Sequence, residues 1–400
     1  MPTRPGIPRP GADSGRSALV VGAGIGGLGV ARALGLAGWQ VQVLEQANAL
    51  DPVGAGITLW PNAVRALDVL GVRIRDYASP PGVGGLRTSS GRWLSRTDTA
   101  DYPARYGAPL VAVHRADLQQ ALLDTLPAGT TATGTRVTGI TQDATGVSVQ
   151  HSSGLSRASL VVLADGLASA NRHLVTGTAV RPRYAGYTAW RGVTRTGAVA
   201  ANQPGTTESW GRGQRFGIVP LAGGRIYWFA TANTPEGQHS PDGPRGEHNQ
   251  VSQLFDGWHA PIAQVLAATA PESVLRHDIY DLQPDPRSYV RGRLALLGDA
   301  AHAMTPNLGQ GACQALEDAV TMGALLHPDV DPALALLDYD QVRRPRAQAI
   351  SSRSRQLGRI GQLSGRSTTT VRDTLLAITP DSAADHQLKS TLAWPVPTLA

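Results

Sequence analysis

Three short apolar runs recur along the chain, and each is followed by a turn containing glycine or aspartate. The runs are Ala-Leu-Val-Val at 18–21, Leu-Val-Val-Leu at 160–163 and Leu-Ala-Leu-Leu at 294–297. Continuous apolar runs of this length, bounded by turn residues, are typical of buried strands. A plain NAD dehydrogenase keeps its dinucleotide motifs in one contiguous domain. The spread of these runs over most of the chain therefore argues against that class.

The first run opens a strand–turn–helix–strand unit. Its parts are Gly-Ala-Gly-Ile-Gly-Gly at 22–27, a helical stretch at 28–36 and a strand at 41–44 followed by Glu45. Here Gly22 allows the tight turn, Gly24 lets the backbone approach a pyrophosphate, and Gly27 lets helix and strand pack closely. Glu45 can accept a hydrogen bond from a ribose 2′-hydroxyl, and its charge disfavours a 2′-phosphate. The unit indicates an ADP-containing dinucleotide but does not separate NAD from FAD.

The third run leads into a loop rich in glycine and proline. After 294–297 come Gly298-Asp299, the loop at 306–311 and an apolar-periodic helix from about 312. The first N–H groups of a helix lack intrahelical partners and favour an anion, either a phosphate or a negatively charged reduced ring. Asp299 can accept a hydrogen bond from a ribityl or ribose hydroxyl. The alternative is an ordinary βα turn with glycines for packing, and this segment alone does not separate the two.

Elsewhere the pattern predicts a second sheet and further helices. The region 181–235 is rich in aromatic residues and strand formers, which favours antiparallel strands near 186–194, 207–211, 214–220 and 225–232. Strands are also expected within 82–113 and 134–163, a polar loop at 235–249, and helices ending near 126, at 249–268, at 332–357 and after 365. The basic second half of the long helix, 343–355, is interpreted as a solvated face.

Length and composition narrow the functional classes. The chain has 400 residues, a net charge of +6 and one cysteine, Cys313. The length suits two closely joined domains. Arginines spread through the chain without a basic block argue weakly for anionic ligands and against nucleic acid. A single cysteine excludes an intrachain disulfide and a Cys-rich metal site, and no metal is expected.

The sequence also bears on location. No apolar run reaches membrane-spanning length, and residues 1–16 lack the apolar core of a secretory signal. Residues 1–16 are therefore expected to form a disordered tail, and the cytoplasm is the expected location.

Taken in order, the motifs resemble those of the single-component FAD-dependent aromatic hydroxylases with the p-hydroxybenzoate hydroxylase fold. The resemblance rests on GAGIGG at 22–27 with Glu45, ADG at 164–166, and GDAAHAMTPNLGQGACQALEDA at 298–319. It covers roughly residues 18–355, and the third motif is the most specific. The chain is most similar to the short branch that includes salicylate and urate hydroxylases.

The resemblance implies an α/β fold: a Rossmann-like FAD-binding domain with an inserted antiparallel-sheet substrate domain and C-terminal helices. The expected division is a tail at 1–16, the FAD-binding domain at 17–180 and 286–360, a substrate-binding domain at 181–285, and a helical and coil tail at 361–400.

The resemblance also implies non-covalent FAD as cofactor, with NADH or NADPH as transient reductant and O₂ as oxidant. Asp165 would lie near the pyrophosphate and the path of the nicotinamide, and Asp299 would bind the ribityl chain. The full predicted cofactor set is Gly22, Gly24, Gly26, Gly27, Glu45, Gln46, Thr58, Arg115, Val137, Asp165, Asp299, Pro306, Gly309, Gln310, Gly311 and Ala312.

The activity that the resemblance implies is hydroxylation of an electron-rich aromatic or N-heteroaromatic molecule by a flavin C4a-hydroperoxide, in a monomer or homodimer. Two alternatives stay open within the fold: oxygenation of a larger indole or polyketide, including epoxidation, and an O₂-independent flavin reductase. A flavin-binding redox sensor would show no substrate-stimulated NAD(P)H oxidation. A halogenase is excluded, because the chain has no Trp-x-Trp-x-Ile-Pro segment and its lysine, Lys389, lies near the C-terminus.

Arg215 and Tyr227 are the predicted catalytic pair, since strand alternation can place both on one sheet face over the flavin. The structural alternative is a surface arginine and a packed tyrosine. The predicted substrate contacts are Tyr187, Trp190 and Trp228, although core packing explains these aromatic residues equally well. His302 is interpreted as a structural hydrogen-bonding residue, and Cys313 as a small buried residue.

Overall fold

The computed structural model describes residues 16–50, 55–75, 83–197, 205–327, 329–379 and 389–399. The predicted tail at 1–16 lies outside these ranges except for Arg16, whose guanidinium donates to the His327 carbonyl at 2.9 Å and lies over the Trp39 ring. No helix in the described part of the chain is long and apolar enough to cross a membrane.

The three apolar runs form neighbouring parallel strands, as predicted. β1 (Ser17–Val21) pairs with β11 (Leu160–Leu163), and β11 pairs with β18 (Leu294–Leu296). The other described strands of this sheet are β2 (Gln40–Leu44) and β7 (Thr131–Ala132) beyond β1, and the antiparallel β17 (Val290–Arg291) beyond β18. Because parallel strands end at the same edge, the three polar turns that follow them lie side by side.

Four helices pack on this sheet or on one another beside it. They are α1 (Ile25–Leu36), α2 (Pro61–Val69), α4 (Arg115–Leu123) and α9 (Gly311–Leu325). A Cβ added at Gly323 of α9 would lie 2.8 Å from the Ala33 Cβ of α1, so the glycine lets the two helices approach closely. Helix α1 begins three residues before the predicted helical stretch at 28–36.

A second sheet contains seven described strands in the order β16-β12-β15-β14-β13-β4-β5. They are β4 (Val83–Thr88), β5 (Trp93–Asp98), β12 (Arg181–Val193), β13 (Thr207–Trp210), β14 (Gln214–Pro220), β15 (Ile226–Ala232) and β16 (Leu275–Gln283). The pairs are antiparallel, as expected, except that β4 runs parallel to β13. β4 and β5 come from before residue 181, so this sheet also draws on the 17–180 segment.

One face of this second sheet is covered by α6 (Gly243–Leu254) and α7 (Ile262–Ala267). The helical stretches expected near 249–268 are these two helices, but the first of them begins inside the predicted loop at 235–249. Pro244 at its first turn supplies the fixed φ that suits a helix start.

The remaining described elements are short or peripheral. They are β3 (Gly56–Leu59) with β6 (Val111–His114), β8 (Val137–Gln142), β9 (Val147–His151), β10 (Gly154–Ala158), α3 (Tyr102–Tyr106), α5 (His173–Thr176), α8 (Asp299–His302), α11 (Arg366–Ile378), η2 (Ala222–Gly224), η3 (Pro271–Ser273) and η4 (Pro306–Leu308). Helix α3 interrupts the region 82–113, which was expected to hold strands alone. Tyr102 and Tyr106 bury one face of this helix against Leu392.

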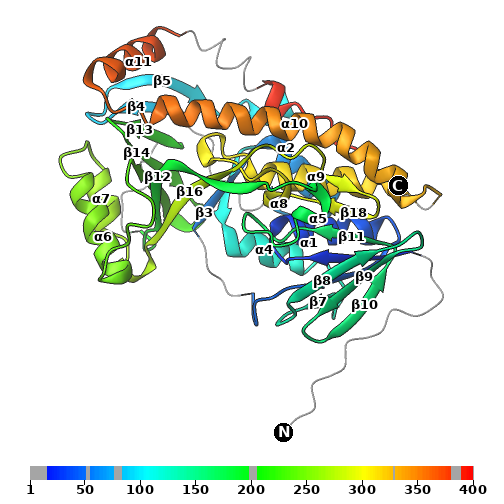
Figure 1. Ribbon diagram of the computed structural model, residues 1–400. Helices are drawn as coiled ribbons and strands as arrows, with labels where there is room; N and C mark the ends of the chain where they lie inside the picture. The colour runs from blue at the N-terminus through cyan, green and yellow to red at the C-terminus, as the bar shows by residue number, and fades with distance from the viewer. Residues whose placement is uncertain are drawn as a thin grey trace.

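Helix α10 (Pro332–Gly361) runs along the molecule past both sheets (Figure 1). Its basic second half is not simply a solvated face, because the Arg343 side chain is fully buried. Arg343 donates from Nε to Asp318 Oδ1 at 2.7 Å and pairs with Glu317, so it ties α10 to α9. Arg346 adds a second donor to Glu317 Oε2 at 2.7 Å.

Arg343→Met is expected to reduce the free energy of unfolding by about 3–5 kcal/mol, because it removes the fully buried counter-charge that Glu317 and Asp318 share. Urea denaturation followed by circular dichroism measures this loss. Arg344→Met is the matched control, since its ion pair with Asp340 is partly exposed and is expected to contribute less than about 1 kcal/mol. Equal losses in the two variants would contradict the assignment.

Candidate cofactor and substrate site

In the glycine turn after β1, Gly22 lies against the end of β11, whereas Gly24 has free space beside it. Gly22 has φ +102°, and a Cβ there would lie 2.5 Å from the Ala164 carbonyl oxygen at the end of β11. A Cβ added at Gly24 would meet no atom within 4 Å. Gly24 is also the N-cap of α1 and provides no side-chain cap. The helix start is therefore free to bind an anion.

Glu45 is held at the rim of this turn. Its Oε2 accepts from the Ala23 N–H and its Oε1 from the Ala47 N–H, both at 2.8 Å. Gln119 of α4 donates to the Ala23 carbonyl at 2.8 Å and braces the turn from another side. Each oxygen of Glu45 keeps a lone pair, so the carboxylate can still accept from a ribose hydroxyl.

Four other predicted cofactor residues belong to segments that follow the turn in the chain. Thr58 lies in β3, Arg115 begins α4, and Val137 begins β8. The exposed Gln46 accepts from Arg136 at 2.9 Å through its side-chain oxygen.

The turn after β11 contains buried polar atoms that need a partner. Asp165 Oδ2 accepts from Asn171 at 3.1 Å, but Asp165 Oδ1 and the Ser169 hydroxyl have no hydrogen-bond partner among the described residues. Leaving such atoms unpaired costs roughly 1–3 kcal/mol each. These two atoms can therefore form hydrogen bonds with polar groups of a bound cofactor. Asp299, at the start of α8, is exposed at the neighbouring strand end.

The loop after α8 presents a second uncapped helix start. Gly309 ends η4 with φ +61°, and α9 then begins at Gly311 with no side-chain cap and no acidic residue in its first turn. A Cβ at Gly311 would meet nothing within 4 Å. Pro306 is exposed and Ala312 half-buried beside this opening. The N–H groups of α9 are thus available to a negatively charged ring.

Two predicted cofactor residues have a different role. The Gln310 side chain is buried and accepts from Asn62 at 3.0 Å, so its cofactor contact would have to come from its backbone. A Cβ at Gly26 would lie 2.7 Å from Leu297 Cδ2, so Gly26 allows α1 to pack on the sheet and α9. Gly27 has the predicted packing role, because a Cβ there would collide with the Gly22 carbonyl.

These features fit FAD. The open glycine turn and Glu45 suit the ADP half, the unpaired atoms of Asp165 and Ser169 suit the middle of the molecule, and the start of α9 suits the flavin ring. Among the described residues, no group of three His, Cys, Asp or Glu could hold a metal ion.

Arg215 and Tyr227 lie on one face of the second sheet, as the strand alternation predicted. Arg215 pairs with Thr231 across β14 and β15, and Val219 pairs with Tyr227. The two side chains are therefore four residues apart along the strands, about 13 Å. This face points towards the cofactor-binding sheet, because Tyr227 packs in a cluster with Ala55 and Ala112 of the first part of the chain.

Arg215 is buried and connects the sheet to the loop at 306–311. It donates from Nη2 to Asn307 Oδ1 at 2.6 Å, from Nη1 to Glu208 Oε1 at 3.1 Å and from Nε to the Thr231 hydroxyl at 3.3 Å. The Tyr187 hydroxyl donates to the same Asn307 oxygen at 3.3 Å. Sequence reasoning missed Asn307 and Glu208, although Asn307 lies inside the third motif.

Tyr227 belongs to a second polar group on this face. Burial raises the pKa of its hydroxyl, and a hydrogen bond with Arg191 opposes part of that rise. Arg191 also contacts His277 Nδ1 at 3.4 Å. Burial lowers the pKa of His277, and the positive charges of Arg191 and Arg115 lower it further. Arg115 is thus close to both the cofactor region and this face.

Trp190 and Trp228 correct the predicted substrate set. Both side chains are fully buried on the opposite face of the sheet, under α6 and α7. The Trp190 indole donates to Glu247 at 2.7 Å, and the Trp228 indole donates to Thr269 at 2.8 Å. A ligand on the face of Arg215 could reach neither residue without crossing the sheet. Of the three predicted aromatic contacts, only Tyr187 lies on the cofactor side.

His302 and Cys313 have the structural roles predicted for them. His302 Nε2 lies 2.6 Å from Asp318 Oδ2 in the buried ionic network. Burial raises the pKa of Asp318, but the charges of His302 and Arg343 lower it to about 2. Cys313 is completely buried in α9, and burial raises the pKa of its thiol to about 12.

Comparisons with known proteins agree with this site. The family model described as "FAD binding domain" matches residues 16–354. The aurachin C monooxygenase/isomerase of Stigmatella aurantiaca is 38% identical over 384 residues, which are 95% of this chain and 99% of that protein. The FAD-dependent urate hydroxylase of Klebsiella pneumoniae is 37% identical over 344 residues, 85% of this chain and 88% of that protein.

The fold agrees as well. A crystal structure of Klebsiella pneumoniae HpxO complexed with FAD and uric acid superimposes with a TM-score of 0.87 at 32% identity, covering 94% of this chain and 96% of that one. The family match, the relatives and the fit of the site to FAD lead to the same conclusion. The chain belongs to the single-component FAD-dependent aromatic hydroxylases, a family of FAD-dependent monooxygenases.

Proposed function

We propose that the protein uses NADH or NADPH and O₂ to hydroxylate an electron-rich aromatic or N-heteroaromatic molecule. The observation that carries the proposal is the hydrogen bond from Arg215 of the second sheet to Asn307, in the loop expected to lie against the flavin ring. Bound FAD would supply the redox chemistry, taking electrons from the reductant and delivering one oxygen atom of O₂. The protein supplies the orientation of the substrate and the exclusion of water.

The substrate ring is proposed to lie between Arg215 and Tyr227 on the cofactor side of the sheet. The pair between them is Gly217 and Phe229, and the Phe229 ring covers the place where a side chain of residue 217 would project. Phe229 offers a flat apolar surface for an aromatic ring. A tyrosine hydroxyl is protonated at neutral pH, and burial raises the pKa of Tyr227 further, so this hydroxyl can donate a hydrogen bond to the substrate.

Glu208 is proposed to decide whether the site favours a neutral or an anionic substrate. Its carboxylate pairs with Arg215, so the two groups together carry no net charge at this corner of the site. A ring without a negative charge, which needs only hydrogen bonds, is therefore favoured over an anionic ring. The apolar side chains Val193 and Leu275 beside Phe229 favour a ring with an apolar substituent.

A larger natural product is the second candidate substrate. The relative from Stigmatella aurantiaca, 38% identical over nearly its whole length, is named for aurachin C rather than for urate. The apolar rim of the face is compatible with such a substituent. An O₂-independent reductase of the same fold is the competing reaction.

The reaction type is tested with FAD-loaded enzyme, an O₂ electrode and a panel of simple and apolar-substituted aromatic molecules. We expect one class to stimulate NAD(P)H and O₂ consumption together, with a product heavier by one oxygen atom in mass spectrometry. NAD(P)H consumption and substrate reduction that continue without O₂ would identify a reductase instead.

Gly24→Ala is expected to weaken FAD binding at least tenfold, because the new methyl group occupies the open side of the turn. The folded protein has room for it, so the free energy of unfolding of the apoprotein should change by less than about 1 kcal/mol. Gly26→Ala is the matched control: its methyl group meets Leu297, which should reduce apoprotein stability by about 1–3 kcal/mol. Fluorescence titration of FAD and thermal unfolding measure the two effects. Unchanged FAD affinity in Gly24→Ala would contradict the proposed cofactor position.

Arg215→Met and Tyr227→Phe are each expected to lower kcat/KM at least tenfold while FAD content is unchanged, since each removes a hydrogen bond to the ring or its loop. Glu208→Gln is expected to shift the kcat/KM ratio about tenfold towards a carboxylate-bearing aromatic relative to its carboxamide, because Arg215 is then uncompensated. Unchanged turnover and KM in both Arg215→Met and Tyr227→Phe would rule out the pair. An unchanged ratio would rule out the role of Glu208.

A further inference from the structure

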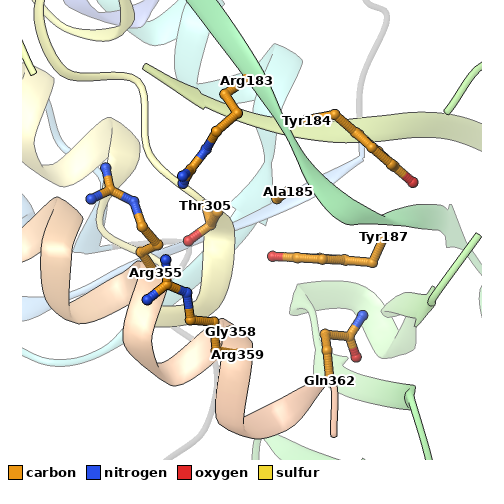
Figure 2. A pocket seen from close by; sticks show the side chains of 9 residues that line it. All are labelled: Arg183, Tyr184, Ala185, Tyr187, Thr305, Arg355, Gly358, Arg359 and Gln362. Atoms are coloured by element: carbon orange, nitrogen blue, oxygen red, sulfur yellow. The ribbon is translucent and has the colours of Figure 1, made fainter. Parts of the chain in front are cut away.

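A pocket of about 240 Å³ lies between β12 and the second half of α10 (Figure 2). None of its lining residues is assigned to FAD, and of the predicted substrate contacts it includes Tyr187. Three arginines line it, Arg183 from β12 and Arg355 and Arg359 from α10, together with Tyr187 and Thr305. Figure 2 shows these side chains converging from the strand and the helix, with the Tyr187 hydroxyl directed towards the arginines. Such a pocket is too small for a dinucleotide but large enough for one charged group.

Two of the three arginines, Arg183 and Arg355, are held in place by one buried carboxylate, Asp281. The Asp281 side chain is only 1% exposed, and Arg183 donates to it from Nε at 3.0 Å and from Nη2 at 2.8 Å. Arg355 pairs with the same carboxylate through its Nε. These bonds fix both guanidinium planes and still leave each group further N–H donors.

The charge of the pocket stays positive after this pairing. Arg355 also approaches Asp285 at 3.5 Å, but the Asp285 side chain is 40% exposed and its charge is therefore screened. Arg359 is exposed, and no described carboxylate forms an ion pair with it. Three arginines are thus balanced by only two carboxylates, Asp281 and the partly exposed Asp285, so the pocket has a net positive charge.

The pocket adjoins the loop expected to lie against the flavin. Thr305 immediately precedes Pro306, and Tyr187 donates to Asn307 at 3.3 Å. Gly358 of α10 packs so closely on Asn307 that a side chain there would collide with the amide. A molecule that has to touch both the flavin ring and a cationic site could span this loop.

We propose that this pocket binds a phosphate or pyrophosphate group. Guanidinium groups fixed in a fork bind phosphate oxygens by paired hydrogen bonds. The group is carried either by the nicotinamide dinucleotide reductant, a source that depends on the proposed function, or by free inorganic phosphate or pyrophosphate. Neither source involves the residues assigned to FAD.

Calorimetric titration of the full-length, FAD-loaded protein with inorganic pyrophosphate tests the site without requiring turnover. Arg359→Gln is expected to raise the pyrophosphate Kd about tenfold, the loss of one charge-assisted hydrogen bond. Arg359 is exposed, so the variant is expected to fold normally. Arg353→Gln is the matched control. Arg353 lies on the same helix but donates to Ser390, outside the pocket. The pyrophosphate Kd of this variant should therefore equal that of the unaltered protein.

The source of the group is identified by rapid-mixing measurement of flavin reduction. If the reductant supplies the phosphate, Arg359→Gln raises the apparent Kd of NADH or NADPH by a similar factor while the limiting reduction rate is unchanged. If the natural ligand is free phosphate or pyrophosphate, Arg359→Gln lowers the affinity for pyrophosphate but leaves the apparent Kd of NADH or NADPH unchanged.

The proposal is overturned if pyrophosphate does not bind the unaltered protein, or if Arg359→Gln and Arg353→Gln bind it equally well. Its failure is distinguishable from failure of the proposed function. If the protein binds pyrophosphate through Arg359 but oxygenates none of the aromatic panel, the anion site is supported and the proposed substrate class is contradicted.

Discussion

The buried contact of Arg343 with Glu317 and Asp318 is the interaction on which the cofactor site depends. All three side chains are fully buried, so each charge needs close partners of opposite charge. Asp318 also accepts from the Gly298 N–H at 3.1 Å and contacts His302. One carboxylate therefore fixes the turn after β18, the helix α8 that contains Asp299 and the helix α9 whose start is proposed to face the flavin. Helix α10 supplies Arg343, so it positions α9 and the turn after β18 although it contributes no residue to the predicted cofactor site.

A second polar connection, at Asn307, joins the loop at 306–311 to the second sheet. The Asn307 oxygen accepts from Arg215 and Tyr187, while its amide donates to the Thr305 hydroxyl and the Ser354 carbonyl at 2.9 Å each. All hydrogen-bonding capacity of this side chain is directed at four different parts of the chain. A displacement of the loop would therefore be transmitted to Arg215, and the burial of these groups makes a partial break costly.

The abundance of arginine has an internal explanation. Arg172, Arg215, Arg276, Arg343 and Arg372 are all buried among the described residues. Arg276, for example, pairs with Asp278 at 2.9 Å inside the second sheet. A planar guanidinium with five donors suits such positions better than an ammonium group. The net charge of +6 is therefore a poor guide to the outer surface, and the pocket at Arg359 is better evidence for an anionic ligand than the composition is.

The parallel strands and the glycine turn of the first sheet could be predicted from the sequence. Buried parallel strands are recognisable because every position is apolar, and Gly22 and Gly24 are recognisable because the turn requires a backbone without side chains. Alternation also placed Arg215 and Tyr227 on one face correctly, since it is a local property of a strand. The tertiary structure alone decided which face meets the cofactor, and so it separated Tyr187 from Trp190 and Trp228. It also decided that Arg343 is buried and that β4 pairs with β13, because burial and strand pairing depend on residues far away in the sequence.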